Sequence, residues 1–403
     1  MAEQQALQEN IWLKDFLLTW INRFSFFLAH HLTRPILPLY VASFDASSTV
    51  IGAVMAVFTI TATLMRFPIG MFIDRLGRKP FLLAGIAFFI VGNFGYLWAP
   101  TILLLIPARI IHGIGWSACT TAVATLAADI APQKRRGELI GYAAMASSLG
   151  GAVGPVLGFA LLKQLAYPGV FLGTVALLLG SLLLAALIPE PKRAPAASVK
   201  KLRWIDLLVV PETLLPAVAV AFLSFGHGGI LTFLPIHALK LGLENPGYWF
   251  GLYAFCLLIV RPVAGPLSDR ISRRAVILPG LFLNFTSIVL LVLADSPAWL
   301  MAAAVVGGLG TGAAQPALMT VAVDQTSPQR RGQSMAQYQS FYDLGIGVGS
   351  LTLGAFLDLV DRSYSLMYVV AAVVALAGLW IYWRRSTPMP ATPAIAAESE
   401  GRF

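Results

Sequence analysis

Long apolar segments separated by short charged loops recur along this chain of 403 residues. A helix of about 20 apolar residues crosses the ~30 Å hydrocarbon layer of a membrane, and these segments reach that length. They are continuous and do not alternate with a period of two, so they favour helices over a β-barrel. We expect twelve spans, near residues 16–42, 49–72, 80–98, 101–127, 138–163, 168–188, 211–238, 246–268, 274–294, 298–323, 333–357 and 364–384.

The composition agrees with a membrane protein. Only 12% of the residues are charged, against roughly 25% in soluble proteins. This excludes an ordinary soluble enzyme, a disordered chain and a nucleic-acid-binding domain, despite a formal net charge of +9. The phosphate-binding loop GxxxxGK[ST] and the catalytic patterns GxSxG and HExxH are absent from the sequence. We therefore expect neither an enzyme nor a nucleotide-driven pump, and no cofactor, metal or nucleic-acid partner.

Lysine and arginine are unevenly distributed among the expected loops. With the N-terminus inside, the inner loops and tails hold twenty of the 28, the outer loops hold three, and five lie within spans. The positive-inside rule then predicts both termini in the cytoplasm of a multi-pass protein of the bacterial inner membrane. One long polar segment divides the chain. We expect an N-terminal six-helix bundle (1–188), a cytoplasmic linker (189–207), a C-terminal bundle (208–385) and a disordered tail (386–403).

The two halves of the sequence repeat one another. Residues 66–79 match residues 261–274 at an offset of 195, which pairs Arg66 with Arg261. The same offset pairs other Gly, Asp and Arg positions further along the chain. Two six-helix halves in parallel repeat are typical of transporters, whose substrate site lies between the halves near the middle of the membrane.

Residues 70–80, GMFIDRLGRKP, resemble the cytoplasmic loop signature of the major facilitator superfamily. The resemblance covers about residues 12–385 and implies an all-α fold of two six-helix bundles that rock about a central cavity. It also implies a gate at this loop, in which Asp74 and the basic side chains contact neighbouring helices and latch the halves together. The alternative is that the basic residues only set the orientation. The expected gating residues are Gly70, Asp74, Arg75, Gly77, Arg78, Lys79 and Asp129, with Gly265, Asp269, Arg270 and Arg273 in the second half.

Three further segments resemble motifs of the same superfamily. Residues 150–158 are similar to its antiporter motif, with Gly150, Gly154, Pro155 and Gly158 at the characteristic positions and Phe159 in place of a closing glycine. Residues 109–115 resemble the buried-arginine motif of proton-linked members, and residues 34–40 resemble the first-span motif of drug and metabolite exporters. These resemblances imply export in exchange for protons.

Ionisable groups inside a membrane are costly and mark candidate functional sites. Asp343 is the only acid placed well inside an expected span, about 15 Å deep. We expect Asp343 to bind and release the coupled proton, with Arg109 or a histidine such as His112 setting its proton affinity. The alternative is an acid that local donors such as Tyr338 satisfy. Arg66 and Arg261 lie two turns inside their spans, and we expect them to reach back to the cytoplasmic interface.

The expected cavity lining combines histidine, arginine and other polar or aromatic residues. His30 and His227 recur at an offset of 197, in spans that line the cavity in this family. Arg34 lies in the outer half of the first span, where it could meet an anionic substrate group. Each of these side chains has packing as its alternative role. The remaining candidates are Asn22, Phe26, Tyr142, Gln315, Gln337 and Phe341.

Together these features predict a monomeric secondary active transporter. It would export a small molecule, a drug-like compound or a metabolite, in exchange for protons by alternating access. Two alternatives stay open: a facilitator or symporter of the same fold that imports a sugar or an organic anion, and a membrane receptor or scaffold without transport.

Overall fold

The computed structural model describes residues 2–130, 136–190, 210–327 and 330–386. Every regular element in these ranges is helical. The elements are α1 (Ala2–Thr33), α2 (Leu37–Ala42), α3 (Ser48–Leu76), α4 (Arg78–Trp98), α5 (Ile102–Ile130), α6 (Arg136–Leu187), η2 (Pro211–Thr213), α8 (Leu214–Lys240), α9 (Gly247–Arg270), α10 (Arg273–Val292), α11 (Pro297–Asp324), α12 (Arg331–Leu359) and α13 (Tyr364–Arg385).

Ten of the described helices are long and apolar enough to cross a membrane. Helix α6 counts once among them, although it covers two of the expected spans. Ala166, with φ 53° and ψ −170°, lies outside the helical region, so two helices meet there at a kink. The all-helical fold is thus confirmed, and the count of twelve spans stays a prediction.

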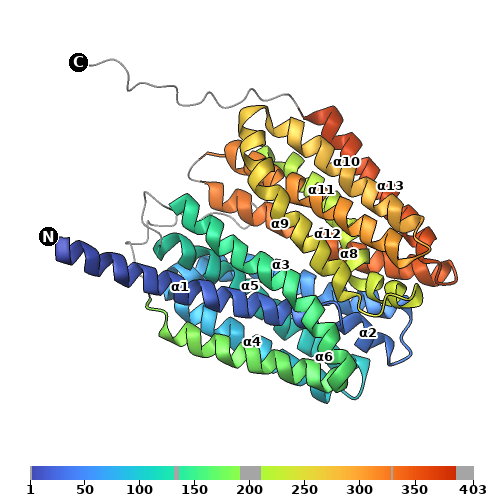
Figure 1. The fold of residues 1–403 in the computed structure, drawn as a ribbon, viewed down its shortest axis with the longest axis horizontal. Coiled ribbons are helices and arrows are strands. Elements are labelled where there is room, and N and C mark those ends of the chain that lie inside the picture. The colour runs from blue at the N-terminus through green and yellow to red at the C-terminus, as the bar shows by residue number, and fades with distance from the viewer. Residues whose placement is uncertain (1, 131–135, 191–209, 328–329, 387–403) are drawn as a thin grey trace.

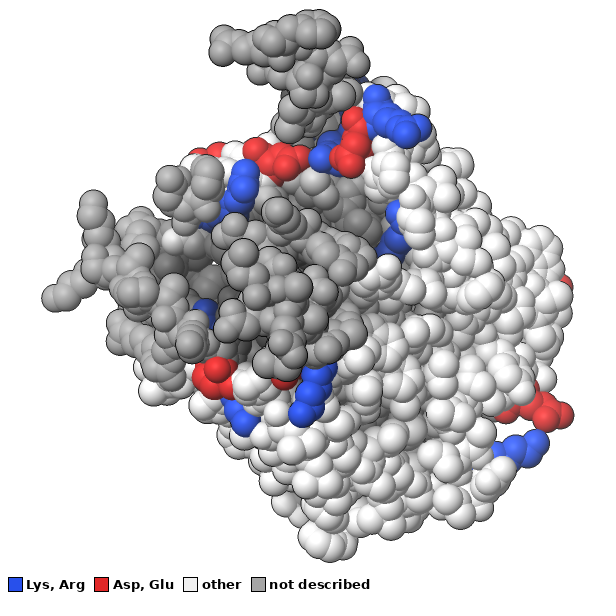
Figure 2. All heavy atoms as spheres, turned by 60° about the vertical axis from the view of Figure 1, so that its left-hand side comes forward, with Lys and Arg blue, Asp and Glu red and all other residues white. Residues whose placement is uncertain are grey.

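The helices form two groups that follow the order of the chain. Figure 1 shows α1–α6 on one side, the N-terminal half, and α8–α13 on the other, the C-terminal half. We call the end that holds the α3–α4 and α9–α10 turns the basic end, and the opposite end the distal end. Figure 2 shows the charged side chains of one face gathered mainly around the basic end, beside a broad flank without charge. That distribution suits a molecule whose flank faces lipid.

Local capping explains where several helices begin. The Ser272 hydroxyl accepts a hydrogen bond from Ala275 N at 3.1 Å at the start of α10. At the start of α4, the Glu190 carboxylate accepts from Arg78 N at 2.7 Å and Lys79 N at 2.8 Å, where the helix dipole favours a negative charge. Between α3 and α4, Gly77 has a φ of 103°, which a glycine adopts without strain.

The apolar core joins the halves at the distal end only. One cluster of buried residues there takes Val41 and Ile51 from the N-terminal half together with Phe233 and Leu353 from the C-terminal half. Two other large clusters each belong to a single half. The described halves therefore share a core at the distal end and have separate cores towards the basic end.

Glycines allow this close approach at the distal end. A Cβ on Gly354 of α12 would lie 2.5 Å from Ser48 O of α3, and one on Gly247 of α9 would lie 2.5 Å from Pro155 O of α6. The Asp358 carboxylate also accepts from Ser48 N and Thr49 N, both at 2.8 Å, which ties α12 to the start of α3. The distal end is closed between the halves.

The basic end lacks this glycine packing at two positions. A Cβ on Gly70 or on Gly265 would meet nothing within 4 Å. The described halves are thus packed closely at the distal end but not at these two glycines.

Candidate functional site

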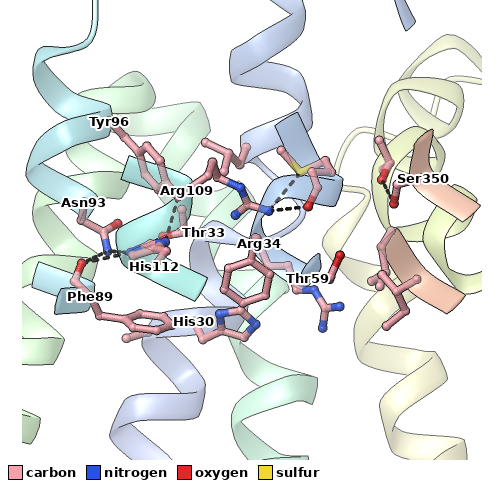
Figure 3. A pocket seen from close by; sticks show the side chains of 17 residues that line it. His30, Thr33, Arg34, Thr59, Phe89, Asn93, Tyr96, Arg109, His112 and Ser350 are labelled. Carbon is pink, nitrogen blue, oxygen red and sulfur yellow. Dashed lines mark hydrogen bonds between the residues drawn. The ribbon is translucent and has the colours of Figure 1, made fainter. Parts of the chain in front are cut away.

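A small cavity lies between the two halves, next to the core that they share at the distal end. Its free volume is about 40 Å³. Most of its walls come from α1, α3, α4 and α5, and residues of α8 and α12 complete it, including Thr232 and Ser350. Figure 3 shows the polar side chains that point into it. Four of the residues expected to carry function line this cavity, namely His30, Arg34, Arg109 and His112.

Arg109 is held firmly by the backbone of α3. Its Nε donates to Val54 O and its Nη2 to Met55 O, both at 3.0 Å. The guanidinium also lies over the Phe58 ring, 4.7 Å from its centroid, a cation–π arrangement. These neutral partners fix the guanidinium in place and leave its positive charge beside the cavity.

His112 is fully engaged on both ring nitrogens. Its Nε2 lies 3.0 Å from Phe89 O, a partner that can only accept, so Nε2 carries the proton. Its Nδ1 lies 2.8 Å from the Tyr96 hydroxyl, which then donates to it. Asn93 also contacts Nε2 at 3.1 Å. The ring is therefore a neutral, satisfied part of the cavity wall, and this network anchors it.

Arg34 and His30 have open hydrogen-bonding capacity. Within the part of the chain that the structure describes, no residue forms a hydrogen bond with the Arg34 guanidinium or with the buried His30 Nε2. Figure 3 shows the Arg34 side chain directed into the space beside His30 and Thr59. The His30 ring packs on Trp116 with centroids 4.2 Å apart, which fixes its position.

Asp343 forms an ion pair that joins the two halves. Arg66 Nη2 of α3 lies 2.7 Å from Asp343 Oδ2 of α12, and the two side chains are only 11% and 8% exposed. Gln339 Nε2 donates to Asp343 Oδ1 at 3.4 Å. We expected Arg109 or a histidine beside this acid and expected Arg66 to reach the interface. In the structure, Arg66 is the residue beside Asp343, because α3 and α12 face each other along the contact between the halves.

The internal repeat places a related contact, in which the partner of the arginine is uncharged, between α9 and α6. Arg261 Nη1 of α9 donates to Ser148 Oγ of α6 at 3.2 Å. Arg261 is the repeat partner of Arg66, and the same offset of 195 makes Ser148 the partner of Asp343. One of the two mirrored contacts between the halves thus carries a carboxylate, and the other carries a hydroxyl.

The loop residues predicted to latch the halves make their described contacts within one half. In the C-terminal half, Arg273 bonds to Asp269, and its Nη2 lies 3.2 Å from Asp324 Oδ2, so α9, α10 and α11 are tied together. In the N-terminal half, Lys79 Nζ donates to Ala186 O at 2.7 Å. The expected latch between the halves therefore stays a prediction. Arg270 is exposed, and the side chains of Asp74, Arg75 and Asp129 lie outside the described residues.

The glycines of the antiporter-like motif bring α6 against α1. A Cβ on Gly150 would lie 2.7 Å from Leu28 N, and one on Gly154 would lie 2.8 Å from His31 Cβ. Gly158 faces the Leu32 carbonyl even more closely. The motif therefore positions α1, the helix that carries His30 and leads to Arg34.

Seven other expected cavity residues do not line this cavity. Asn22 donates to Ser181 O at 2.6 Å within the N-terminal half, and Gln337 donates to Val210 O at 3.2 Å. His227 bonds to Tyr253. Tyr142 is 46% exposed, and Phe26 is fully buried in an apolar cluster. The two others are Gln315, whose carbonyl accepts from Tyr338, and Phe341, which packs on the core of the C-terminal half.

Several residues of the site were not predicted. Tyr96, Asn93 and Thr59 line the cavity, but single polar residues in apolar helices give no sequence signal of their own. Arg66 did carry a signal, because a second buried charge at a depth similar to Asp343 is the natural partner for it. In the described residues, no group of three His, Cys, Asp or Glu side chains could hold a metal ion.

Comparison with known proteins identifies relatives that match this chain over most of its length. The family model described as Major Facilitator Superfamily matches residues 16–259 and 245–401. An uncharacterised MFS-type transporter of Methanocaldococcus jannaschii is 23% identical over 379 residues, covering 90% of this chain and 96% of the relative. The multidrug resistance protein MdtG of Yersinia enterocolitica is 24% identical over 398 residues, 94% of each chain. A solved bacterial homologue of the human lysosomal transporter Spinster aligns with a TM-score of 0.73 at 17% identity, over 94% of this chain and 99% of its own.

Proposed function

Because the chain belongs to the Major Facilitator Superfamily, a family of membrane transporters, we propose that it exports a small molecule in exchange for protons. The multidrug resistance protein among its relatives supports export. We further propose that the protein works as a monomer in the cytoplasmic membrane, with the basic end and both termini in the cytoplasm. The excess of lysine and arginine in the loops of that end supports this orientation.

The buried ion pair between Arg66 and Asp343 is the observation that carries the proposal. Asp343 lies twelve residues into α12, about 18 Å along the helix, and among the described residues it is the one carboxylate in the middle of a span. A proton on Asp343 removes its charge and weakens the bond to Arg66. Since that bond joins α3 to α12, protonation would change how firmly the halves hold together.

The rest of the interface explains how this change becomes transport. With the distal end closed between the halves, the cavity would be loaded with substrate from the basic end, on the cytoplasmic side. Substrate and proton then act on the same interface, because the ion pair and the cavity both lie where α3 and α12 meet between the halves. Alternating access needs two such global states and ligands that favour one over the other.

Flux in proteoliposomes tests the proposal directly. Vesicles loaded with a pH-sensitive dye, under an imposed proton gradient, receive a panel of drugs, sugars, amino-acid derivatives and metal chelates. We expect one class to trigger proton movement in the opposite direction, and Asp343→Asn to abolish it. Asp295→Asn, which neutralises an exposed acid at the distal end, is the matched control and keeps full coupling.

Three results would contradict the proposal. Substrate flux without proton movement would make the protein a facilitator. Proton and substrate movement in the same direction would make it a symporter. Full coupling in Asp343→Asn would remove the ion pair from the mechanism. The double variant Arg66→Gln/Asp343→Asn guards against simple misfolding, because it removes both buried charges and is also expected to lack coupling.

A further inference from the structure

The cavity between the halves contains two arginines and no acid among its lining residues. We propose that it is a binding site for the anionic group of an organic anion, a carboxylate, sulfonate or phosphate. This inference rests on the proposed transport function and names its substrate class. It separates this chain from a transporter whose cavity is built for cationic drugs, which needs a carboxylate facing the ligand.

The charge balance of the interior supports the proposal. Five arginines lie within spans, and among the described residues only Arg66 has a carboxylate partner there. Arg109 is bonded to neutral backbone carbonyls, and the Asp343 carboxylate, which does not line the cavity, is bonded to Arg66. The wall of the cavity thus carries two guanidinium groups and no carboxylate, and in a medium of low dielectric such an excess of positive charge attracts an anion.

The open donors show where the anion would sit. Arg34 has five N–H groups in a planar fork, and a carboxylate can accept two of them in parallel. His30 Nε2 is buried in the same wall and has no partner among the described residues. His30 lies in the last turn of α1, and Arg34 directly follows that helix. Thr59 and Ser350 add hydroxyl groups to the same cavity.

The size of the cavity limits what enters it in this conformation. A volume of about 40 Å³ is far below the ~300–1,000 Å³ of a pocket for a drug-sized ligand. A compact anionic head fits, whereas a bulky one requires the halves to move. The walls around the charged groups include Phe58, Phe89, Leu231 and Ile346. They favour an apolar body attached to the head.

Ligand binding to the purified full-length protein tests this inference without any proton gradient. The probes share one apolar body and differ in the head: naphthoate, naphthalenesulfonate and naphthyl phosphate are anions, naphthamide is neutral, and naphthyltrimethylammonium is a cation. A ligand that binds the folded state raises the thermal unfolding temperature, and the stabilisation grows with the logarithm of its concentration divided by its Kd. We expect at least one anion to stabilise the wild type at concentrations where naphthamide and naphthyltrimethylammonium do not.

Variants identify the residue responsible. Arg34→Gln is expected to weaken binding of that anion about tenfold to hundredfold, the range for a charge-assisted hydrogen bond. Arg34→Lys keeps the charge and should retain part of the affinity. Arg23→Gln is the matched control, since Arg23 is another arginine of α1 whose Nε donates to Ser147 at 2.6 Å and which does not line the cavity. It should bind the anion as the wild type does.

Each contrary result overturns the inference. These are equal stabilisation by naphthamide, stronger stabilisation by naphthyltrimethylammonium, no stabilisation by any anion, or unchanged anion binding in Arg34→Gln. Anion binding that depends on Arg34 would stand even if the flux experiment found no proton coupling. Failure of the proposed function and failure of this inference are thus distinguishable.

Discussion

Closure of the distal end depends on the missing side chain of Gly354. In Gly354→Ala the new Cβ would lie 2.5 Å from Ser48 O, a backbone atom of the other half that cannot rotate away. An ordinary contact of this kind begins at 3.4 Å, so α3 and α12 must separate by about 0.9 Å at this point. Overpacking of this kind typically costs about 1–3 kcal/mol. The cost falls on the closed state alone, because the two helices part when the distal end opens.

That cost predicts a measurable shift in population. At 1.4 kcal/mol for each tenfold change, the ratio of closed to open molecules should fall about fivefold to hundredfold. Alanine also has a higher helix propensity than glycine, but this gain is equal in both states and cancels. The variant should therefore fold normally and favour the conformation that is open at the distal end.

Distances between spin labels at the distal end provide the assay. Ser43 in the N-terminal half and Arg362 in the C-terminal half are both exposed, so cysteines there can carry the labels. Cys119 and Cys256 are buried and are replaced by alanine. The matched control is Gly180→Ala, because a Cβ on this exposed glycine of α6 meets nothing within 4 Å. An unchanged distance distribution in a folded Gly354→Ala variant, or an equal shift in the control, would refute the reasoning.

Two further predictions concern the polar contacts between the halves. Asp358→Ala removes the acceptor for Ser48 N, Thr49 N and the Thr49 hydroxyl. It should destabilise the closed distal end relative to the open one by about 1.5–3 kcal/mol. An unchanged modification rate of a cysteine at position 48 would contradict this role of Asp358. Asp343→Asn leaves the Arg66 charge buried without a partner, which should cost about 3–5 kcal/mol. Arg66→Gln/Asp343→Asn should recover much of that loss in thermal unfolding, and a double variant less stable than the single one would show that the pair is not the relevant contact.

The fold was predictable because its signals are redundant. Each span repeats the same apolar length, and the two halves repeat the same loop sequence, so an error in one segment does not change the architecture. The membership of the chain in the superfamily confirms the resemblance carried by residues 70–80. The break at Ala166 was also predictable, since the expected spans end at residue 163 and begin again at 168, and Pro168 follows Ala166 two residues later.

The site was only partly predictable. Helical periodicity indicates which residues share one side of a helix, but it does not indicate how far along the helix the cavity lies. Asn22, Phe26 and His30 are four residues apart and follow one side of α1, yet only His30 reaches the cavity. Phe26 and Asn22 lie about 6 and 12 Å from His30 towards the N-terminus of α1, where this helix packs within its own half. The partner of Asp343 was missed for a related reason. Arg66 is 277 positions away, and the sequence does not state which helices of the two halves face each other.

The mirrored contacts of Arg66 and Arg261 have a consequence for stoichiometry. A carboxyl group has a charged and a neutral form, whereas the hydroxyl of Ser148 keeps the same charge. Under the proposed mechanism, the Arg66–Asp343 contact would therefore respond to protons, and the Arg261–Ser148 contact would not. Coupling through these two contacts would then involve at most one proton per turnover. When the substrate carries a single negative charge, export of the anion and entry of one proton each move one elementary charge in the same electrical direction. Such an exchange would transfer two elementary charges per cycle, so its rate would depend on voltage as well as on pH.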